Sequence, residues 1–172
     1  HNKYSTNTQG WFPWNFDQCH MAEHSTVLEI GCGDGSLWLE NKEKIPKQLH
    51  VVLSDISEGM LRDTRRAIHA NVKTSRFDFQ VFDCERIPYP DNSFDLVIAN
   101  HILFYCKNLT SVFEEISRVL KTGGTFVCST YGAAHMKEIN ELVSEFDDRI
   151  VLSADRLFER FGKENGADLL AP

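Results

Sequence analysis

Three glycines and a later acid in this chain are spaced in a way that suits a nucleoside-containing ligand. The segment 27–38 reads VLEIGCGDGSLW, with glycine at Gly31, Gly33 and Gly35. A residue without a Cβ lets the backbone pass close under a ligand, and a glycine loop between a strand and a helix forms a binding loop at the carboxyl end of a sheet. Asp55 stands twenty residues after Gly35, where a carboxylate accepts hydrogen bonds from a ribose diol. These residues predict a site for an adenosine-containing cofactor.

The charges around the glycine loop favour one class of adenosine cofactor over another. A dinucleotide-binding loop reads G-x-G-x-x-G, and its sixth position is Ser36 here. Glu29 and Asp34 flank the loop, and a carboxylate repels a pyrophosphate by roughly 1 kcal/mol or more for a close pair near the surface. The same acids suit an ammonium and a sulfonium group. The loop therefore favours S-adenosylmethionine, and a nicotinamide-dependent oxidoreductase is the less favoured alternative.

Several motifs in order resemble those of class I S-adenosylmethionine-dependent methyltransferases, of the ubiquinone and menaquinone biosynthesis group (methyltransferase type 11). They are the loop 29–35, Asp55, the pair Asp83 and Cys84, and the segments PDNSFDLVIAN (90–100) and ISRVLKTGGTFVCSTY (116–131). The resemblance covers about residues 27–131. It implies transfer of a methyl group from S-adenosyl-L-methionine to a small-molecule acceptor by in-line displacement.

The resemblance implies a binding role for residues around the methionine and ribose parts of the cofactor. Gly31 and Gly33 would lie under the methionine part, and the alternative is a tight strand-to-helix turn. Glu29 would orient the loop through backbone N–H groups and face the ammonium, unless it is a surface acid. Asp55 would accept from both ribose hydroxyls. Asn100 would face the methionine moiety, or simply end its strand.

Four further residues are implied for the adenine. Ile56 and Met60 would pack on the face of the ring, although an apolar pair at a helix start is equally expected in the core. Asp83 would accept from the exocyclic amine, and the backbone N–H beside it, at Cys84, would donate to a ring nitrogen. The alternative for Asp83 is a turn or a helix cap.

Two residues are candidates for catalysis itself. Methyl transfer needs mainly proximity and alignment, and a base is required only where the acceptor must lose a proton. His101, directly after Asn100, is the candidate base, with a structural or exposed histidine as the alternative. Tyr4 is the candidate lid residue. Phe104 and Tyr105 would line the acceptor pocket or belong to the core.

Composition limits the classes of protein to which the chain could belong. Its 172 residues, 42% hydrophobic and 25% charged, are typical of one globular domain, and the net charge of −7 makes nucleic acid an unlikely partner. The five cysteines form no C-x-x-C pair, so neither a zinc site nor a disulfide framework is predicted. Together with the lack of a membrane span or a signal peptide, they lead us to expect a cytoplasmic protein.

Strand-like and helix-like segments alternate along the chain, which predicts an α/β fold with a mostly parallel sheet covered on both faces. The strands are expected at 27–30, 49–54, 77–82, 94–99 and 125–129. Helices are expected at 109–120 and about 134–146, with shorter ones after Gly35 and Ser57. The helix 109–120 would begin at the cap Asn108 and end in the glycine turn 121–124. The resemblance adds a Rossmann-like doubly wound topology with strand order 3-2-1-4-5.

The domain organisation follows from these elements. We expect a single domain over 1–172, with an N-terminal lid or cap at 1–24, a cofactor-binding core at 25–131 and C-terminal helices at 132–172. The two last strands of the family, an antiparallel hairpin, are not recognisable. The fifth strand would then be an open edge, which predicts self-association or low stability. The missing strands also leave open a cofactor-binding protein without turnover.

Overall fold

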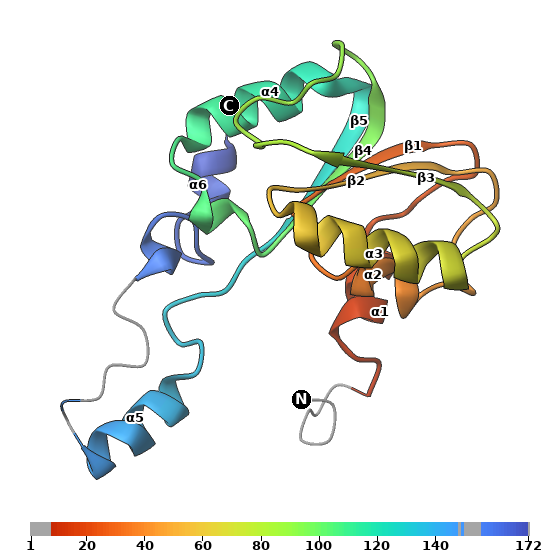
Figure 1. Ribbon diagram of the computed structural model, residues 1–172. Helices are drawn as coiled ribbons and strands as arrows, with labels where there is room; N and C mark the ends of the chain where they lie inside the picture. Colours follow the sequence, from red (N-terminus) through yellow and green to blue (C-terminus); the bar gives the residue numbers. More distant parts are fainter. Residues whose placement is uncertain (1–7, 148, 150–155, 172) are drawn as a thin grey trace.

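The structure, a computed structural model, describes residues 8–147, 149 and 156–171. Its centre is one sheet of five parallel strands in the order β3-β2-β1-β4-β5 (Figure 1), which confirms the predicted α/β class and topology. The strands are β1 (Thr26–Ile30), β2 (His50–Asp55), β3 (Arg76–Val81), β4 (Phe94–Asn100) and β5 (Leu120–Ser129). All five predicted strands are present.

Helices separate most of these strands along the chain, whereas β3 and β4 follow each other without a helix between them. The helices are α1 (Trp11–Gln18), α2 (Ser36–Leu39), α3 (Glu58–Asn71), α4 (Leu109–Val119), α5 (Lys137–Phe146) and α6 (Gly166–Leu170), with short 3-10 turns η1 (Leu103–Tyr105) and η2 (Leu157–Glu159). The hydroxyl of Ser57 accepts from the Met60 N–H at 3.3 Å, and the Asn108 side chain accepts from the Ser111 N–H at 3.2 Å. These two caps fix the starts of α3 and α4. With 14 residues, α3 is longer than the short helix that we expected there.

The core lies on both faces of the sheet because alternate residues of a strand point to opposite sides. Val27 and Val51 pack on the side of α1, α2 and α3, in a cluster that includes Trp38. Leu28 and Val52 pack on the opposite side, under α4. Figure 1 shows these helices on the two sides of the strands. Burial on both faces explains why β1 and β2 read as nearly continuous apolar runs.

The passage from α4 to β5 differs from the prediction. The segment 120–124 does not form a glycine turn that caps the helix but belongs to β5, and α4 ends at Val119. Leu120 pairs directly with Phe94, and a register shift follows before Leu96 pairs with Thr125. Gly123 has φ +80°, a conformation that suits glycine within such a bulge. Tertiary pairing with β4 therefore overrides the local helix-stop signal.

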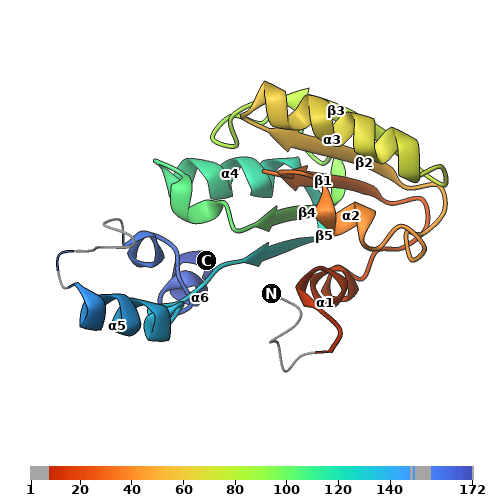
Figure 2. The same cartoon turned by 60° about the horizontal axis from the view of Figure 1, so that its bottom comes forward.

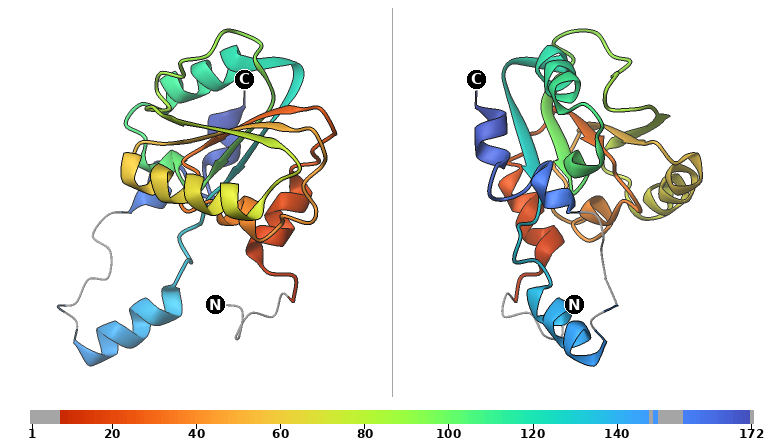
Figure 3. Two further views of the ribbon diagram at one scale, coloured as in Figure 1. Left: turned by 45° about the vertical axis from the view of Figure 1, so that its right-hand side comes forward. Right: turned by 90° about the vertical axis from the view of Figure 1, so that its left-hand side faces the viewer.

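The C-terminal segments lie differently in relation to the sheet. Helix α5 projects away from it in Figures 2 and 3, whereas η2 and α6 lie near η1 and the end of β5. The Thr130 hydroxyl donates to the Phe161 carbonyl oxygen at 2.7 Å, and the Phe161 ring is buried against Phe113. Within the described ranges, no strand follows β5, and no helix has the length and apolar character needed to cross a membrane.

Candidate functional site

The loop after β1 needs two of its three glycines for packing. Gly31, Gly33 and Gly35 all have positive φ, at +68°, +54° and +77°. A Cβ on Gly31 would lie 2.3 Å from Cγ2 of Ile102, and one on Gly35 would lie 2.8 Å from Cγ2 of Thr64. A Cβ on Gly33 would meet nothing within 4 Å. Close packing in the tight turn therefore explains why Gly31 and Gly35 are glycines, whereas no side chain covers the backbone at Gly33.

Asp55, at the end of β2, is fixed by the same loop. Its Oδ2 accepts from the Gly33 N–H at 3.1 Å, and its Oδ1 accepts from the Ser57 N–H at 2.8 Å. The Thr64 hydroxyl donates to the Gly33 carbonyl oxygen at 2.6 Å, so α3 also holds the loop. A carboxylate oxygen has two lone pairs and can accept a second hydrogen bond. Asp55 is thus positioned and still able to bind a hydroxyl.

A first hollow, here called the Asp55 cavity, has a volume of about 390 Å³ and lies beyond the carboxyl ends of the strands. It brings together residues that follow β1, β2, β3 and β4 in the chain. Its lining consists of Ile30, Gly31, Asp55, Ile56, Phe82, Asp83, Cys84, Glu85, Ile102, Tyr105, Cys106 and Lys107. The predicted ribose and adenine residues Asp55, Ile56, Asp83 and Cys84 therefore share one cavity.

The apolar residues predicted for the adenine face are not core residues. The side chain of Ile56 is 74% exposed and that of Met60 is 44% exposed. Ile56 lines the Asp55 cavity, and Met60 is not part of its lining. Asp83 also makes the turn contact that we considered as the alternative, because its Oδ1 accepts from the Glu85 N–H at 3.0 Å. It therefore stabilises a turn and lines the cavity.

A second hollow of about 270 Å³, the Glu29 cavity, lies on the other side of the loop. Its lining consists of Trp11, Phe12, Glu29, Gly31, Cys32, Gly33, Asp34, Ser36, Leu37, Asn100 and His101. Gly31 belongs to both cavities. The carboxyl end of the sheet therefore carries two adjacent hollows that meet at the glycine loop.

Glu29 is a buried acid and not a surface one. It is 3% exposed, and its Oε2 accepts from the indole Nε1–H of Trp38 at 2.6 Å. Burial raises the pKa of Glu29 to about 8, although the Trp38 hydrogen bond opposes this, and Asp34 and Asp55 raise it further. The expectation that Glu29 bonds to backbone N–H groups of the loop is corrected, because Trp38 in α2 is its partner.

Asn100, at the end of β4, is held by two residues that the sequence did not suggest. Asn15 in α1 exchanges two amide hydrogen bonds with it, at 3.0 Å and 3.2 Å, and the Ser129 hydroxyl donates to its Oδ1 at 2.9 Å. Asn15 is only 2% exposed. The sequence feature that could have pointed to Asn15 is its position as a polar residue between the aromatic residues Trp14 and Phe16. The network ties α1 to the ends of β4 and β5.

His101 lies against α1 at the mouth of the Glu29 cavity. Its ring centroid is 5.0 Å from that of Trp11, and its φ of +55° turns the chain away from the strand. Burial lowers the pKa of His101, and the neighbouring His135 lowers it further. Phe104 is buried against Tyr131, whereas the side chain of Tyr105 is 66% exposed and lines the Asp55 cavity. Only Phe104 of that aromatic pair belongs to the core.

The remaining candidate, Tyr4, lies outside the residues that the structure describes. Of the other predicted site residues, Met60 alone lies outside both linings. No group of three or more histidine, cysteine or acidic side chains suited to a metal occurs in the described part of the chain.

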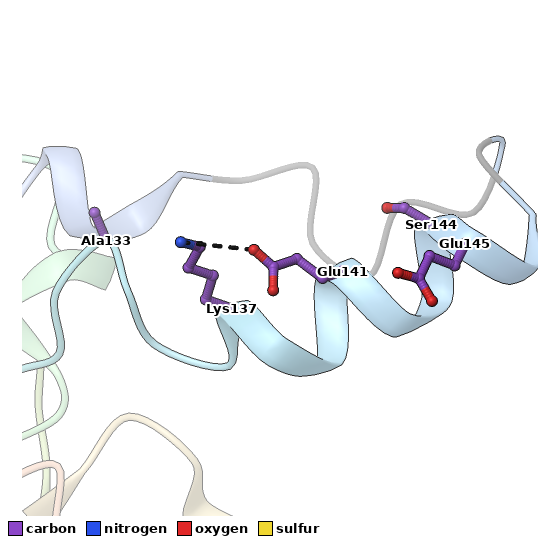
Figure 4. A pocket seen from close by; sticks show the side chains of 5 residues that line it. All are labelled: Ala133, Lys137, Glu141, Ser144 and Glu145. Carbon is purple, nitrogen blue, oxygen red and sulfur yellow. Dashed lines mark ion pairs between the residues drawn. The ribbon is translucent and has the colours of Figure 1, made fainter.

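A third hollow, larger than either of these two, is elsewhere and has a different character. It measures about 470 Å³ and is lined by Ala133 and four residues of α5. Figure 4 shows the four side chains of α5 along one helix and Ala133 outside it, and the Lys137 ammonium lies 3.6 Å from the Glu141 carboxylate. All five lining residues are exposed. A hollow along one exposed helix holds no fixed or buried polar group, so volume does not identify the site here.

Comparisons with known proteins agree with this geometry. Residues 28–128 match the methyltransferase domain family. The chain is 32% identical over 121 residues to the demethylmenaquinone methyltransferase of Symbiobacterium thermophilum, covering 69% of this chain and 48% of that protein. It is 30% identical over 135 residues to the malonyl-(acyl-carrier protein) O-methyltransferase of Nitrosospira multiformis, covering 71% and 44%. The chain thus spans about half the length of these curated relatives.

A solved structure has the same fold. The SAM-dependent methyltransferase from Methanosarcina mazei superposes with a TM-score of 0.60 at 23% identity, covering 73% of this chain and 61% of that one. The family match begins within β1 and ends within β5, so it contains the glycine loop and every strand end that borders the two cavities. The chain therefore belongs to the methyltransferase domain family.

Proposed function

We propose that this chain binds S-adenosyl-L-methionine across the two cavities and transfers its methyl group to a small-molecule acceptor, with S-adenosyl-L-homocysteine as the product. The observation that carries the proposal is the junction at Gly31, where a cavity with an exposed apolar wall and fixed carboxylates meets one with a buried acid. The cofactor has the same two halves, a nucleoside and a charged amino acid.

The Asp55 cavity suits the nucleoside. Asp55 accepts from the ribose hydroxyls, while its own position is maintained by two backbone N–H groups. Ile56, and Met60 beside the cavity, cover the adenine ring. Asp83 accepts from the exocyclic amine, and the Cys84 N–H donates to a ring nitrogen. The exposure of Ile56 supports this assignment, because an exposed apolar side chain beside a cavity gains from being covered.

The Glu29 cavity suits the amino-acid part. The backbone at Gly31 and Gly33 runs under it, with open space above Gly33. Asn100 faces the same part. A carboxyl group whose pKa is raised to about 8 by burial lacks a cation. The ammonium of the cofactor would supply that cation and favour the ionised form of Glu29.

The chemistry follows from these positions. The cofactor, when bound, supplies a methyl group on a positively charged sulfur, which is already activated. The protein therefore contributes mainly alignment of the acceptor with that methyl group. His101 accepts a proton where the acceptor must lose one, because a lowered pKa keeps the imidazole neutral at neutral pH. Tyr4 acts as a lid residue in this proposal.

The wider context of the chain is also part of the proposal. Residues 1–24 form a cap, 25–131 the cofactor-binding core and 132–172 a C-terminal part of one domain. The acceptor is a small molecule, and the net charge of −7 weighs against a nucleic acid. Five cysteines that are all free support a reducing compartment such as the cytoplasm. β5 is an edge strand, which supports self-association; a monomer with a high melting temperature would contradict it.

Calorimetric titration with S-adenosyl-L-homocysteine tests the cofactor. We expect micromolar binding, no binding of NADH, and a loss of at least about tenfold in Asp55→Ala, since a hydrogen bond to a charged group contributes roughly 1.5–3 kcal/mol. Asp78→Ala is the matched control, because Asp78 lies on β3 in a surface pair with His50 and Arg76. Binding of NADH alone would overturn the proposal. Intact binding without methyl transfer to any acceptor would support a cofactor-binding protein without turnover.

A further inference from the structure

Two cysteines from separate segments meet in the wall of the Asp55 cavity. Cys84 follows β3 and Cys106 follows η1, 22 residues apart in the chain, and their Sγ atoms are 3.4 Å apart. Both line the cavity, and both are half-buried. The thiols are therefore in contact with each other and reachable from a hollow large enough for a small molecule.

The backbone beside this contact is tied together. Glu85 follows Cys84, and its Oε1 accepts from the N–H groups of Lys107 at 2.9 Å and Asn108 at 3.0 Å. The residues next to the two cysteines are thus joined by charge-assisted hydrogen bonds. These bonds hold the two backbone segments that carry the cysteines next to each other.

The contact makes the two thiols unequal. The hydrogen bond between the two thiols lowers the pKa of Cys106 and raises that of Cys84, while burial and the carboxylates of Asp83 and Glu85 oppose ionisation of Cys106. The Cys106 sulfur also lies 3.7 Å from the Ile102 carbonyl oxygen, to which the thiol can donate. The ionised thiol is the nucleophile in thiol chemistry, and the contact leaves either cysteine able to attack first, because either sulfur can be the donor.

We propose that Cys84 and Cys106 form a reversible disulfide in the wall of the Asp55 cavity by exchange with a low-molecular-weight disulfide. One of the two cysteines attacks, as its thiolate, one sulfur of that disulfide, the small S–S bond breaks, and one small thiol leaves with a proton from solvent. The other cysteine loses its proton and attacks the mixed disulfide at the sulfur of the first cysteine, which releases the second small thiol. The two protein thiols are oxidised, and the small disulfide is reduced to two thiols.

Oxidation would change the cavity. A disulfide requires the sulfurs to approach from 3.4 Å to about 2.0 Å, which draws the turn that carries Asp83 toward the segment after η1. Both segments line the Asp55 cavity, so we expect the oxidised form to bind a nucleoside less well. This coupling rests on the proposed cofactor site, whereas the disulfide itself does not.

The other cysteines provide internal controls. Cys19 and Cys32 are buried, and burial raises the pKa of Cys19 to about 12 and also raises that of Cys32. Cys128 is half-buried like the pair, and burial raises its pKa. These three thiols should stay reduced under conditions that oxidise the pair.

The test is to equilibrate the folded protein in glutathione buffers of increasing oxidised fraction, block free thiols, and digest with trypsin without reductant. Trypsin separates the peptides 77–86 and 87–107, which contain Cys84 and Cys106. We expect these peptides joined in one species that dithiothreitol splits. Cys106→Ser should abolish the species, and Cys128→Ser should retain it. Only glutathione adducts, a link to Cys128, or a link formed only in denaturant would overturn the proposal.

Binding provides the second measurement. We expect oxidation to weaken S-adenosyl-L-homocysteine binding roughly tenfold, and saturating ligand to make the pair harder to oxidise by the same factor, since coupling is reciprocal. Cys106→Ser should make the affinity insensitive to the oxidant. A cross-link without any change in affinity would support the disulfide but overturn its proposed coupling to ligand binding. If the reduced protein binds no homocysteine compound, the proposed function fails while the peptide measurement still decides the disulfide.

Discussion

The hollows at the carboxyl end of the sheet and the hollow along α5 are built in different ways. Residues from β1, β2, β4 and α1, and from the turns that follow β3 and β4, converge on the former, whereas four of the five residues lining the latter come from one helix. The former holds a buried acid and a loop of glycines with positive φ. Glycine adopts such a conformation without steric cost, whereas burying an acid costs stability. A fixed group that costs stability therefore marks this site better than volume does.

The largest expected effect concerns the charge of Glu29. Its folded pKa of about 8 lies above the ordinary value, so the folded state holds its proton where the unfolded state has lost it. Stability from this group is full below about pH 4.5 and is lost as the pH rises to about 8. Relative to Glu29→Gln, the native protein should lose roughly 3–5 kcal/mol across that range in urea titrations. Parallel curves would contradict the assignment.

The matched control for Glu29 lies in α5. The side chain of Glu141 is 61% exposed. Glu141→Gln should change the free energy of unfolding by less than about 0.5 kcal/mol at each pH, as expected for a surface position. A similar pH effect in both variants would remove the distinction between the two regions.

The next effect separates two glycines within the loop. Gly31→Ala should destabilise the protein by about 3 kcal/mol, because its Cβ would meet Ile102 at 2.3 Å in a left-handed conformation. Gly33→Ala should destabilise the protein by only about 1 kcal/mol, because the space around its Cβ is open and the only cost is that of placing alanine in a left-handed backbone conformation. Chemical denaturation measures both. Equal losses would show that Ile102 moves aside at no cost.

A smaller effect tests how α1 holds the site. Asn15→Ala should cost about 2 kcal/mol in thermal unfolding, because Asn100 is left without its amide partner in a poorly hydrated place. Asn71→Ala removes an exposed hydrogen bond within α3 and serves as the control, with an expected loss below about 1 kcal/mol. If the two losses were alike, α1 would not be fixed by this pair.

The smallest effect belongs to α5. Phe146 is 87% exposed and Leu142 is 66% exposed. Phe146→Ser should change the free energy of unfolding by no more than about 0.5 kcal/mol. A loss above about 1 kcal/mol would mean that this helix packs against something and would weaken the contrast with the site.

Much of the fold could be predicted because it depends on short-range patterns. Apolar runs located all five strands. Asp55 and Asp83 each stand where a predicted strand ends, which placed both at the carboxyl end of the sheet, where they share a cavity. The segment 120–124 was misinterpreted because two glycines after a helix usually end it, and only pairing with β4 decides otherwise. A local sequence pattern gives no information on whether pairing with a distant strand will prevail over a helix-ending turn.

The surroundings of the predicted site residues were less accessible. The Glu29 contact with Trp38 depends on how α2 turns under the loop, and Asn15 reaches Asn100 across 85 residues of sequence. Cys84 and Cys106 likewise meet only through the fold. Spacing in the chain carries no information on such pairs. The roles of the eleven candidates, Tyr4 and His101 included, stay predictions.

The position of Gly31 in both cavities has a consequence for molecules smaller than the cofactor. In the proposed binding mode, adenosine alone would fill only the Asp55 cavity, and methionine alone only the Glu29 cavity. Each fragment loses its own translational and rotational freedom on binding, whereas the joined molecule loses it once. The affinity of the whole should therefore exceed the product of the two fragment affinities. The loop after β1 would then work as the bridge of a bivalent receptor.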